Sequence, residues 1–210
     1  MSHRKIIKEV SQYYTEKIQR FGSTPQGVDW KDEASQKIRF DELLKIINKP
    51  TSFEVNDLGC GFGSMFLYMI ESGFEKFRYN GYDISEEMIT QARHMCDAYP
   101  QAGFTKISDS KELAAADFTI ASGIFNVKME YKENEWLDYI LSTLADMNTN
   151  SRSGFSFNLL TSYHDKEFTK ENLYYADPRF VFEYCKTHFS KYVSLLHDYK
   201  LYEFTIHVRK

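Results

Sequence analysis

The 210-residue chain is poor in cysteine, proline and glycine, with 3, 4 and 10 residues of each type. Three widely spaced cysteines without a Cys-x-x-Cys pair argue against a disulfide framework or a zinc cluster. The scarcity of glycine and proline argues against low-complexity disorder, since 17 Phe and 15 Tyr can bury a large apolar area. We therefore expect one ordinary globular unit in a reducing compartment, and a cytoplasmic protein.

Positive charge and long apolar runs are also scarce. Lys and Arg number 26 against 30 Asp and Glu, which gives a formal net charge of −4 and a pI near 5.9. Nucleic-acid backbones attract proteins with a positive field, so DNA and RNA are disfavoured as partners. The segment MSHRKIIKEVSQYYTEK is unlike a signal peptide, and no segment reaches the length of a membrane span. We expect neither a membrane nor a nucleic-acid partner, and the oligomeric state stays open.

Two helices are predicted at the start of the chain. Apolar residues recur at helical spacing over residues 4–20 and again over 33–48. The segment FGSTPQGVDW between them contains Pro25 and two glycines, which suit an ordered loop. We predict that residues 1–50 form an N-terminal helical lid and residues 51–210 the main domain, together one structural domain.

From residue 53 the sequence alternates between strand-like and helix-like segments. The strand-like runs are FEVNDL, FRYNGYD, GFTKIS, DFTIAS and GFSFNLL. The helical stretches are expected near 63–73, 85–99, 133–147 and 178–188. Two last runs, KYVSLLHD and LYEFTIHV, predict an antiparallel hairpin joined at Tyr199 and Lys200. The expected fold is α/β: a Rossmann-like, doubly wound, seven-stranded and mostly parallel sheet with this hairpin and the N-terminal helical lid.

A glycine-rich turn follows the first predicted strand. The sequence VNDLGCGFGS places Asp57, Gly59, Gly61 and Gly63 between that strand and a helix, where glycines allow positive φ and a helix end offers free N–H groups. Asp83 ends the next strand, where a carboxylate can accept hydrogen bonds from both hydroxyls of a ribose. The two features together predict a nucleoside-cofactor site. The alternative interpretation is that no cofactor binds here, the glycines form only a tight turn and Asp83 caps the next helix.

Two kinds of nucleoside cofactor compete for this site. A dinucleotide-binding motif requires a third glycine or alanine where this chain has Ser64, and it has no role for an acid at the position of Asp57. A nicotinamide-dependent oxidoreductase therefore stays a minor alternative. The form acid-x-Gly-x-Gly-x-Gly, here DLGCGFG, instead resembles the first motif of the class I S-adenosylmethionine-dependent methyltransferases. The resemblance covers about residues 53–210.

The resemblance implies S-adenosylmethionine as cofactor, S-adenosylhomocysteine as product and a set of cofactor-binding residues. Asp57 and the backbone from Gly59 to Gly63 would hold the methionine end, with Cys60 in this loop as a small residue without chemistry of its own. Asp83 would hold the ribose. The remaining implied contacts are Ile84 and Met88 beside the adenine, Ser108 and Asp109 at its edge, and Ser122 and Gly123 beneath the cofactor. From the residues alone, Asp109 is equally well a helix cap.

The opening segment resembles the N-terminal lid of small methyltransferases that modify surface polysaccharides and metabolites. This second resemblance implies that lid side chains close over the cofactor or the acceptor: Tyr13, Gly27, Trp30, Gln36, Arg39 and Phe40. Arg39 would be available to a carboxylate or phosphate. The alternative is that these side chains only pack the helices on the sheet.

The acceptor is expected beyond the carboxyl ends of the later strands, where ligands of open α/β sheets bind. A hydroxyl acceptor must lie in line with the methyl group and lose its proton. His164, beside Tyr163, is the first candidate for the base and His197 the second, although a lone histidine is more often structural. Further residues expected to orient the acceptor are Asn126, Tyr175 and Tyr199. We expect no metal, because the six histidines lack ligand-like spacing.

These features predict a methyltransferase that acts on an oxygen of a small polar or anionic acceptor. The resemblance to polysaccharide-modifying methyltransferases implies a sugar, sugar phosphate or phosphoramidate-type precursor of a surface polysaccharide as the acceptor. The segment ASGIFN lacks the Asn/Asp-Pro-Pro-aromatic motif of enzymes that methylate nucleobase or amide nitrogens. A protein or RNA methyltransferase and a non-catalytic, nucleoside-binding interaction module stay as alternatives.

Overall fold

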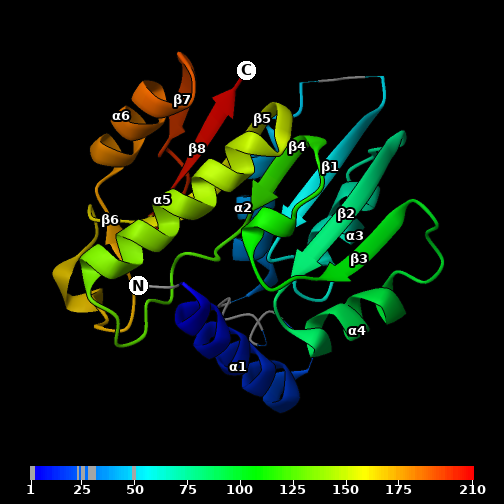
Figure 1. Cartoon of the computed structure of the whole chain (residues 1–210), viewed down its shortest axis with the longest axis horizontal. Helices are drawn as coiled ribbons and strands as arrows, with labels where there is room; N and C mark the ends of the chain where they lie inside the picture. Colours follow the sequence, from blue (N-terminus) through cyan, green and yellow to red (C-terminus); the bar gives the residue numbers. More distant parts are fainter. Residues whose placement is uncertain (1–2, 23, 25–26, 28–31, 49–50) are drawn as a thin grey trace.

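The strand-like runs pair into one sheet in the computed structural model, which describes residues 3–22, 24, 27, 32–48 and 51–210 (Figure 1). The strand order is β3-β2-β1-β4-β5-β8-β7, and a short further strand, β6, pairs with β5. The strands are β1 (Phe53–Leu58), β2 (Phe77–Asp83), β3 (Ala102–Lys106), β4 (Ala116–Ala121), β5 (Ser151–Thr161), β6 (Tyr175–Ala176), β7 (Tyr192–Leu196) and β8 (Glu203–Arg209). The mostly parallel α/β fold is confirmed, with eight strands rather than seven.

Helices cover both faces of the sheet. They are α1 (Arg4–Phe21), α2 (Glu33–Leu44), α3 (Ser64–Glu71), α4 (Glu86–Met95), α5 (Glu133–Thr149) and α6 (Pro178–His188). One core cluster joins α1, α5 and α6 to the sheet, and the other joins α2, α3 and α4 to the opposite face. Figure 1 shows α5 crossing in front of β4 and β5 with α2 behind them. Each helix therefore buries one of its sides against one face of the sheet, and in α2 this side includes polar residues such as Gln36 and Arg39.

The C-terminal hairpin differs from the prediction in its connection. β7 and β8 are antiparallel, as expected, but residues 197–202 separate them rather than a turn at Tyr199 and Lys200 alone. The carbonyl of Tyr202 accepts a hydrogen bond from Thr161 N–H, at the end of β5. The residues just before β8 therefore stay paired with the end of β5, although β7 has already ended. This pairing makes the loop between β7 and β8 longer than predicted.

The strand order places the carboxyl ends of β1, β2 and β4 together. β1 is parallel to β2 on one side and to β4 on the other, and the chain leaves β1 in the glycine turn that leads to α3. This is the point at which the order of parallel strands reverses, where open α/β sheets bind their ligands.

Gly154 in β5 offers a test of the sheet packing. Its φ is +150°, and an added Cβ would lie 2.3 Å from the carbonyl oxygen of Val208 in β8. We expect Gly154→Ala to lower the free energy of unfolding by roughly 2–4 kcal/mol, because both the backbone and the strand spacing must shift. Urea titration followed by circular dichroism measures this change. Gly103→Ala is the matched control, since a Cβ there meets nothing closer than 3.9 Å. Equal losses in the two variants would contradict the interpretation.

Candidate functional site

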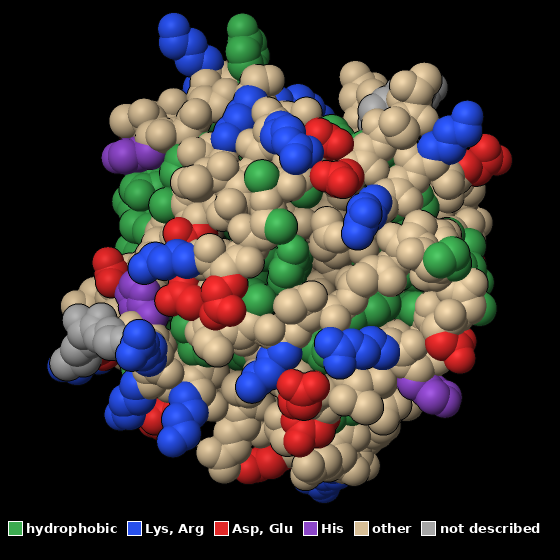
Figure 2. All heavy atoms as spheres, turned by 45° about the vertical axis from the view of Figure 1, so that its right-hand side comes forward, with side chains coloured by type: hydrophobic (Ala, Val, Ile, Leu, Met, Phe, Trp, Pro, Cys, Tyr) green, Lys and Arg blue, Asp and Glu red, His purple; other side chains and the backbone are tan. Residues whose placement is uncertain are grey.

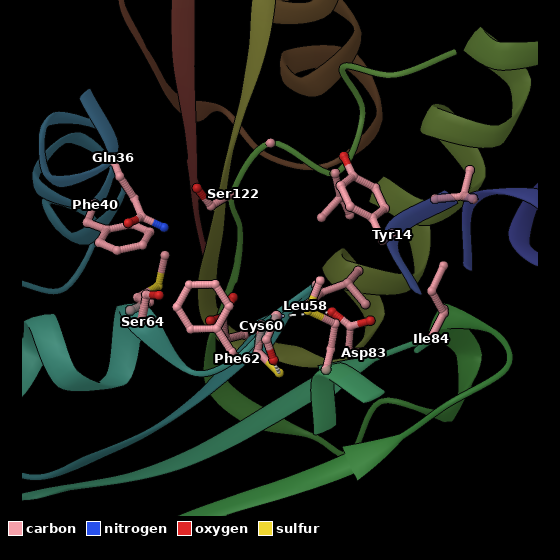
Figure 3. Close-up of a pocket in the computed structure, with 18 of the residues that line it drawn as sticks. Tyr14, Gln36, Phe40, Leu58, Cys60, Phe62, Ser64, Asp83, Ile84 and Ser122 are labelled. Carbon is pink, nitrogen blue, oxygen red and sulfur yellow. Dashed lines mark hydrogen bonds between the residues drawn. The ribbon is translucent and has the colours of Figure 1, made fainter. Parts of the chain in front are cut away.

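A pocket with about 890 Å³ of empty space, part of it open to solvent, lies at the carboxyl ends of β1, β2 and β4. Figure 3 shows Gln36 and Phe40 of α2 on one side and Tyr14 of α1 with Ile84 on the other. The full lining is Val10, Tyr14, Gln36, Phe40, Asp57, Leu58, Gly59, Cys60, Gly61, Phe62, Ser64, Met65, Asp83, Ile84, Met88, Ser122, Gly123, Ile124 and Tyr139. The mixture of a few polar groups with aromatic and aliphatic walls is typical of a small-molecule site.

The glycine turn forms the floor of the pocket. Gly59 and Gly61 have φ values of +80° and +54°, and the N–H groups of Gly59 and Cys60 donate to the carbonyl of Tyr82 at 2.7 and 3.0 Å. An added Cβ at Gly59 would lie 2.2 Å from the Cγ2 atom of Ile124. Only glycine therefore lets the turn fold back against β2 and approach the opposite wall this closely.

Asp57 brings a buried carboxylate to this floor. Its side chain is almost fully buried, and its Oδ2 atom accepts a hydrogen bond from Tyr79 Oη. Its Oδ1 atom has no partner among the residues that the structure describes. Burial raises the pKa of Asp57 to about 7, against the opposing effect of the Tyr79 hydrogen bond and with a smaller push from Asp83. An unpartnered carboxylate oxygen in a pocket is costly, so it indicates that a ligand donates to it.

Asp83 supplies the second carboxylate of the pocket. Its Oδ2 atom accepts from Gly61 N–H at 3.0 Å and its Oδ1 atom from Ser85 N–H at 2.9 Å. Burial raises its pKa, while these backbone hydrogen bonds act in the opposite direction. A carboxylate has about four lone-pair positions, so each oxygen keeps capacity for a ligand hydroxyl.

The α1 helix is fastened directly over the segment after β2. Ser11 Oγ donates to the carbonyl of Ile84 at 3.0 Å, and the hydroxyls of Thr15 and Ser85 are 2.9 Å apart. Val10 and Tyr14 of α1 line the pocket, whereas the predicted Tyr13 does not. Tyr13 instead packs edge-on against Tyr14 and under Lys17. The i and i+4 spacing of Val10 and Tyr14 was the signal that could have identified the inward face.

The loop after β4 closes the pocket from above. Gly123 N–H donates to Asn158 Oδ1 at 2.8 Å, and Ser122 Oγ is buried with no partner. Figure 3 shows Ser122 between the α2 side chains and Tyr14. The Ser122 hydroxyl thus has no hydrogen-bond partner in the described part of the chain.

Three of the predicted cofactor residues lie outside the lining. Gly63 caps α3, and a Cβ there would lie 3.1 Å from Cys96 Sγ, so this glycine serves packing. Ser108 is exposed and its N–H donates to Glu112. Asp109 caps the turn Ser110–Glu112, as the alternative interpretation expected. Asp109 and burial, the larger cause, raise the pKa of the pocket residue Tyr139 to about 12.

The predicted catalytic residues also lie outside the lining. His164 stacks on Tyr175 with ring centroids 4.0 Å apart. Its Nδ1 atom lies 2.8 Å from the Thr161 carbonyl oxygen, and its Nε2 atom lies 2.8 Å from Thr169 Oγ1. Tyr163 and His197 are exposed and lie beside each other, with ring centroids 6.1 Å apart. The loop that carries Tyr163 and His164 continues into Tyr174, whose N–H donates to the Asn126 carbonyl, whereas His197 lies in the connection between β7 and β8. These residues therefore lie next to the segment after β4, outside the pocket.

The remaining predicted lid and acceptor residues have varied positions. Arg39 is not available to an anion, because its guanidinium is buried against Glu203. Asn126 is buried outside the lining, with an unpartnered Oδ1 atom. Tyr199 donates to or accepts from Thr205 Oγ1 at 3.0 Å, and Tyr175 receives a hydrogen bond from Lys170 N–H. Gln36 and Phe40 line the pocket, and Trp30 lies outside the described residues.

The polar and apolar groups of the pocket together fit a cationic nucleoside ligand. The pocket offers a free carboxylate oxygen, a second carboxylate with backbone partners and apolar walls at Ile84 and Met88. In the described part of the chain, no three His, Cys, Asp or Glu side chains converge as a metal site would require. A search of the same residues finds no helix long and apolar enough to cross a membrane.

Comparison with known proteins identifies methyltransferases as relatives. A family model described as a methyltransferase domain matches residues 55–149. The chain is 46% identical over 167 residues to Rv1506c of Mycobacterium tuberculosis, named as a candidate methyltransferase, with 80% of this chain and 99% of that protein covered.

Two solved structures share the fold over nearly their full lengths. Magnesium protoporphyrin IX methyltransferase (ChlM) from Synechocystis PCC 6803, with bound SAM, has a TM-score of 0.65 and 14% identity, covering 100% of this chain and 98% of that one. The complex of DhpI with SAM and HEP has a TM-score of 0.66 and 15% identity, covering 100% of both chains. Both structures carry the cofactor that the sequence motif implies.

Proposed function

Because the chain belongs to the class I S-adenosylmethionine-dependent methyltransferases, we propose that the pocket between α1, α2 and the carboxyl ends of β1, β2 and β4 holds this cofactor. The observation that carries the assignment is the Oδ1 atom of Asp57, which lines the pocket and has no partner among the described residues. It would accept a hydrogen bond from the ammonium group at the methionine end. The Asp83 oxygens would accept from the ribose hydroxyls, and Ile84 and Met88 would flank the adenine.

The cofactor, when bound, supplies a methyl group on a positively charged sulfur. The task left to the chain is to hold an acceptor in line with that group and to exclude water. Phe40, Phe62 and Tyr14 provide the enclosing walls. Gly123 and the free hydroxyl of Ser122 face the same space from the loop after β4. Positioning by these groups is the main catalytic contribution that we assign to the chain.

We infer that the acceptor is small, polar and neutral and that its oxygen receives the methyl group. No Lys or Arg occurs among the described residues of the lining, and the Arg39 guanidinium is paired with Glu203. An anionic acceptor would therefore lack a cationic partner within the described lining, which favours a free sugar or sugar-like hydroxyl over a sugar phosphate. The Ser122 hydroxyl and the Gln36 amide are the polar groups that would orient it.

We assign removal of the hydroxyl proton to the residues beside the pocket, next to the segment after β4. His164 is the proposed base, and because its ring lies outside the pocket lining, this role requires the loop after β5 to bring the ring to the reacting oxygen. Its Nδ1 atom must carry the proton because it faces the carbonyl of Thr161, so Nε2, which now faces the Thr169 hydroxyl, is the basic atom. Tyr163 and His197 would line the same edge as acceptor-binding residues.

Incubation with methyl-labelled S-adenosylmethionine tests the proposed function. The protein is mixed with a cell extract, and label is counted separately in small molecules and in macromolecules, with the Asp83→Ala variant as control. Label in the small fraction supports the proposal, and resistance of the labelled product to mild alkali distinguishes an ether from an ester. Label confined to protein or RNA would overturn the acceptor class. Charged side chains of both signs are mixed on the face in Figure 2, which favours a small acceptor over a nucleic acid.

The pKa of Asp57 predicts a pH dependence of cofactor binding. Near pH 6 the carboxyl of the free protein is mostly protonated, because its pKa is about 7. A bound ammonium favours the ionised form, so affinity rises as pH rises through this pKa. We expect the dissociation constant of S-adenosylhomocysteine to fall roughly five- to tenfold between pH 6 and 7.5, as measured by calorimetry. A flat profile in the wild-type protein would contradict the Asp57 assignment.

A further inference from the structure

A row of buried polar side chains runs from α2 through β8 and β5 to the loop after β4. Its members are Arg39, Glu203 and Asn158, with 8%, 1% and 0% of each residue exposed. None of the three lines the pocket. We call these three side chains, together with the N–H of Gly123, the α2 relay.

The hydrogen bonds of the α2 relay are continuous. Arg39 Nε lies 3.0 and 2.9 Å from the two carboxylate oxygens of Glu203, and Arg39 Nη2 donates to Oε1 at 2.5 Å. Asn158 Nδ2 donates to Glu203 Oε2 at 2.5 Å, and Asn158 Oδ1 accepts from Gly123 N–H at 2.8 Å. A network whose members are all paired is stiff and fixes one arrangement.

Both ends of the α2 relay reach the pocket wall. Gln36 and Phe40 lie three residues before and one residue after Arg39 on the same helix, and both line the pocket. Gly123 lines it from the other side. The relay therefore joins the α2 wall to the loop after β4 through the sheet, without crossing the pocket.

Other bonds hold the far end of α2 and do not reach the pocket. Ser156 Oγ donates to the carbonyl of Leu43 at 3.0 Å, and His207 Nε2 lies 2.8 Å from the carbonyl of Glu42. These contacts and the apolar packing of Leu43 and Leu44 fasten the helix to the sheet. A buried ion pair is not needed for that purpose, since apolar replacements often stabilise a protein equally well.

We propose that Arg39, Glu203 and Asn158 are positioning residues that set the distance between the α2 wall and the loop at Gly123. Cofactor affinity then depends on three side chains that do not touch the cofactor. The proposal rests on the cofactor site proposed above, because it concerns the spacing of that site's two walls.

The double variant Arg39→Met/Glu203→Met tests this role. It removes both charges together, so no buried charge is left unpaired and the fold is expected to persist. We expect calorimetry to show at least tenfold weaker binding of S-adenosylhomocysteine. Hydrogen exchange by mass spectrometry should show faster exchange in the peptide that contains Gly123. If the double variant does not fold, Asn158→Leu, which keeps the Arg39–Glu203 pair, should give the same two changes.

Ser156→Ala is the matched control, since it removes a buried bond to α2 that does not lead to Gly123. It should leave both the affinity and the exchange of the Gly123 peptide unchanged. Unchanged affinity in the folded relay variants, or an equal loss in Ser156→Ala, would overturn the α2 relay alone. Wild-type protein that fails to bind S-adenosylhomocysteine would overturn the cofactor site and this proposal with it.

Discussion

Asp57→Asn is expected to weaken binding of S-adenosylhomocysteine roughly 10- to 100-fold, because one hydrogen bond between charged groups is lost. The same change should stabilise the protein without ligand at pH 8. The pKa of Asp57 is near 3.8 in the unfolded chain and about 7 in the fold, so between these values the unfolded state binds fewer protons than the folded state. Stability of the wild-type protein therefore falls as pH rises from about 4 to 7, and this loss is absent in the variant.

Comparison of two pH values isolates this effect. From pH 5 to pH 8 the wild-type protein should lose about 1–3 kcal/mol of stability relative to Asp57→Asn, as measured by urea unfolding. Any constant cost of the amide cancels in this difference. Asp177→Asn, a helix-capping carboxylate outside the pocket, is the control for affinity and should bind as the wild-type protein does. Equal pH profiles in wild type and Asp57→Asn would show that the Asp57 pKa is not raised.

Asp83→Ala is expected to weaken binding further, by roughly 10²- to 10⁴-fold. Two hydrogen bonds from the ribose to a carboxylate are lost, at roughly 1.5–3 kcal/mol each. The N–H groups of Gly61 and Ser85 also lose their acceptor, which loosens the glycine turn. Calorimetry with S-adenosylhomocysteine measures the total effect.

A pair of simpler ligands separates the ribose contact from the loosened turn. The wild-type protein should prefer adenosine to 2′,3′-dideoxyadenosine, because only adenosine donates to Asp83. In Asp83→Ala this preference should disappear, whereas damage to the turn alone would weaken both ligands and preserve it. A wild-type protein without the preference would remove Asp83 from the ribose site.

The parts of the fold that are encoded locally could be predicted from the sequence. β1 and β2 match the predicted runs, each of which begins after a polar residue and ends near the glycine turn or at Asp83, and α6 begins at Pro178 after the capping Asp177. The pocket floor is of the same kind, since Asp57 and the glycine turn are consecutive in sequence and Asp83 ends the next strand. Strand, turn and helix follow one another here without long-range information.

Features that depend on distant partners could not be predicted. Arg39 suggested an anion site, but its partner Glu203 is 164 residues away and the sequence carries no sign of the pair. The short β6 exists only because β5 extends far enough to pair with it. The prediction of Tyr13 rather than Tyr14 is wrong because one residue turns a helix face by about 100°, and both positions are aromatic, so the residue types do not show which one faces inward.

The separation of Arg39 from Glu203 in the sequence also affects the order in which contacts form while the protein is synthesised. Arg39 leaves the ribosome early, and its partner lies on β8, the last strand in the sequence, so this buried ion pair cannot form until synthesis is almost complete. Closing so long a loop costs entropy, and parallel pairing of β1 with β4 adds further delay. A chain that stops before β8 would keep the glycine turn but leave a guanidinium without its carboxylate. In such truncated chains the unpaired Arg39 would destabilise α2, because the residue that neutralises it, Glu203, is missing.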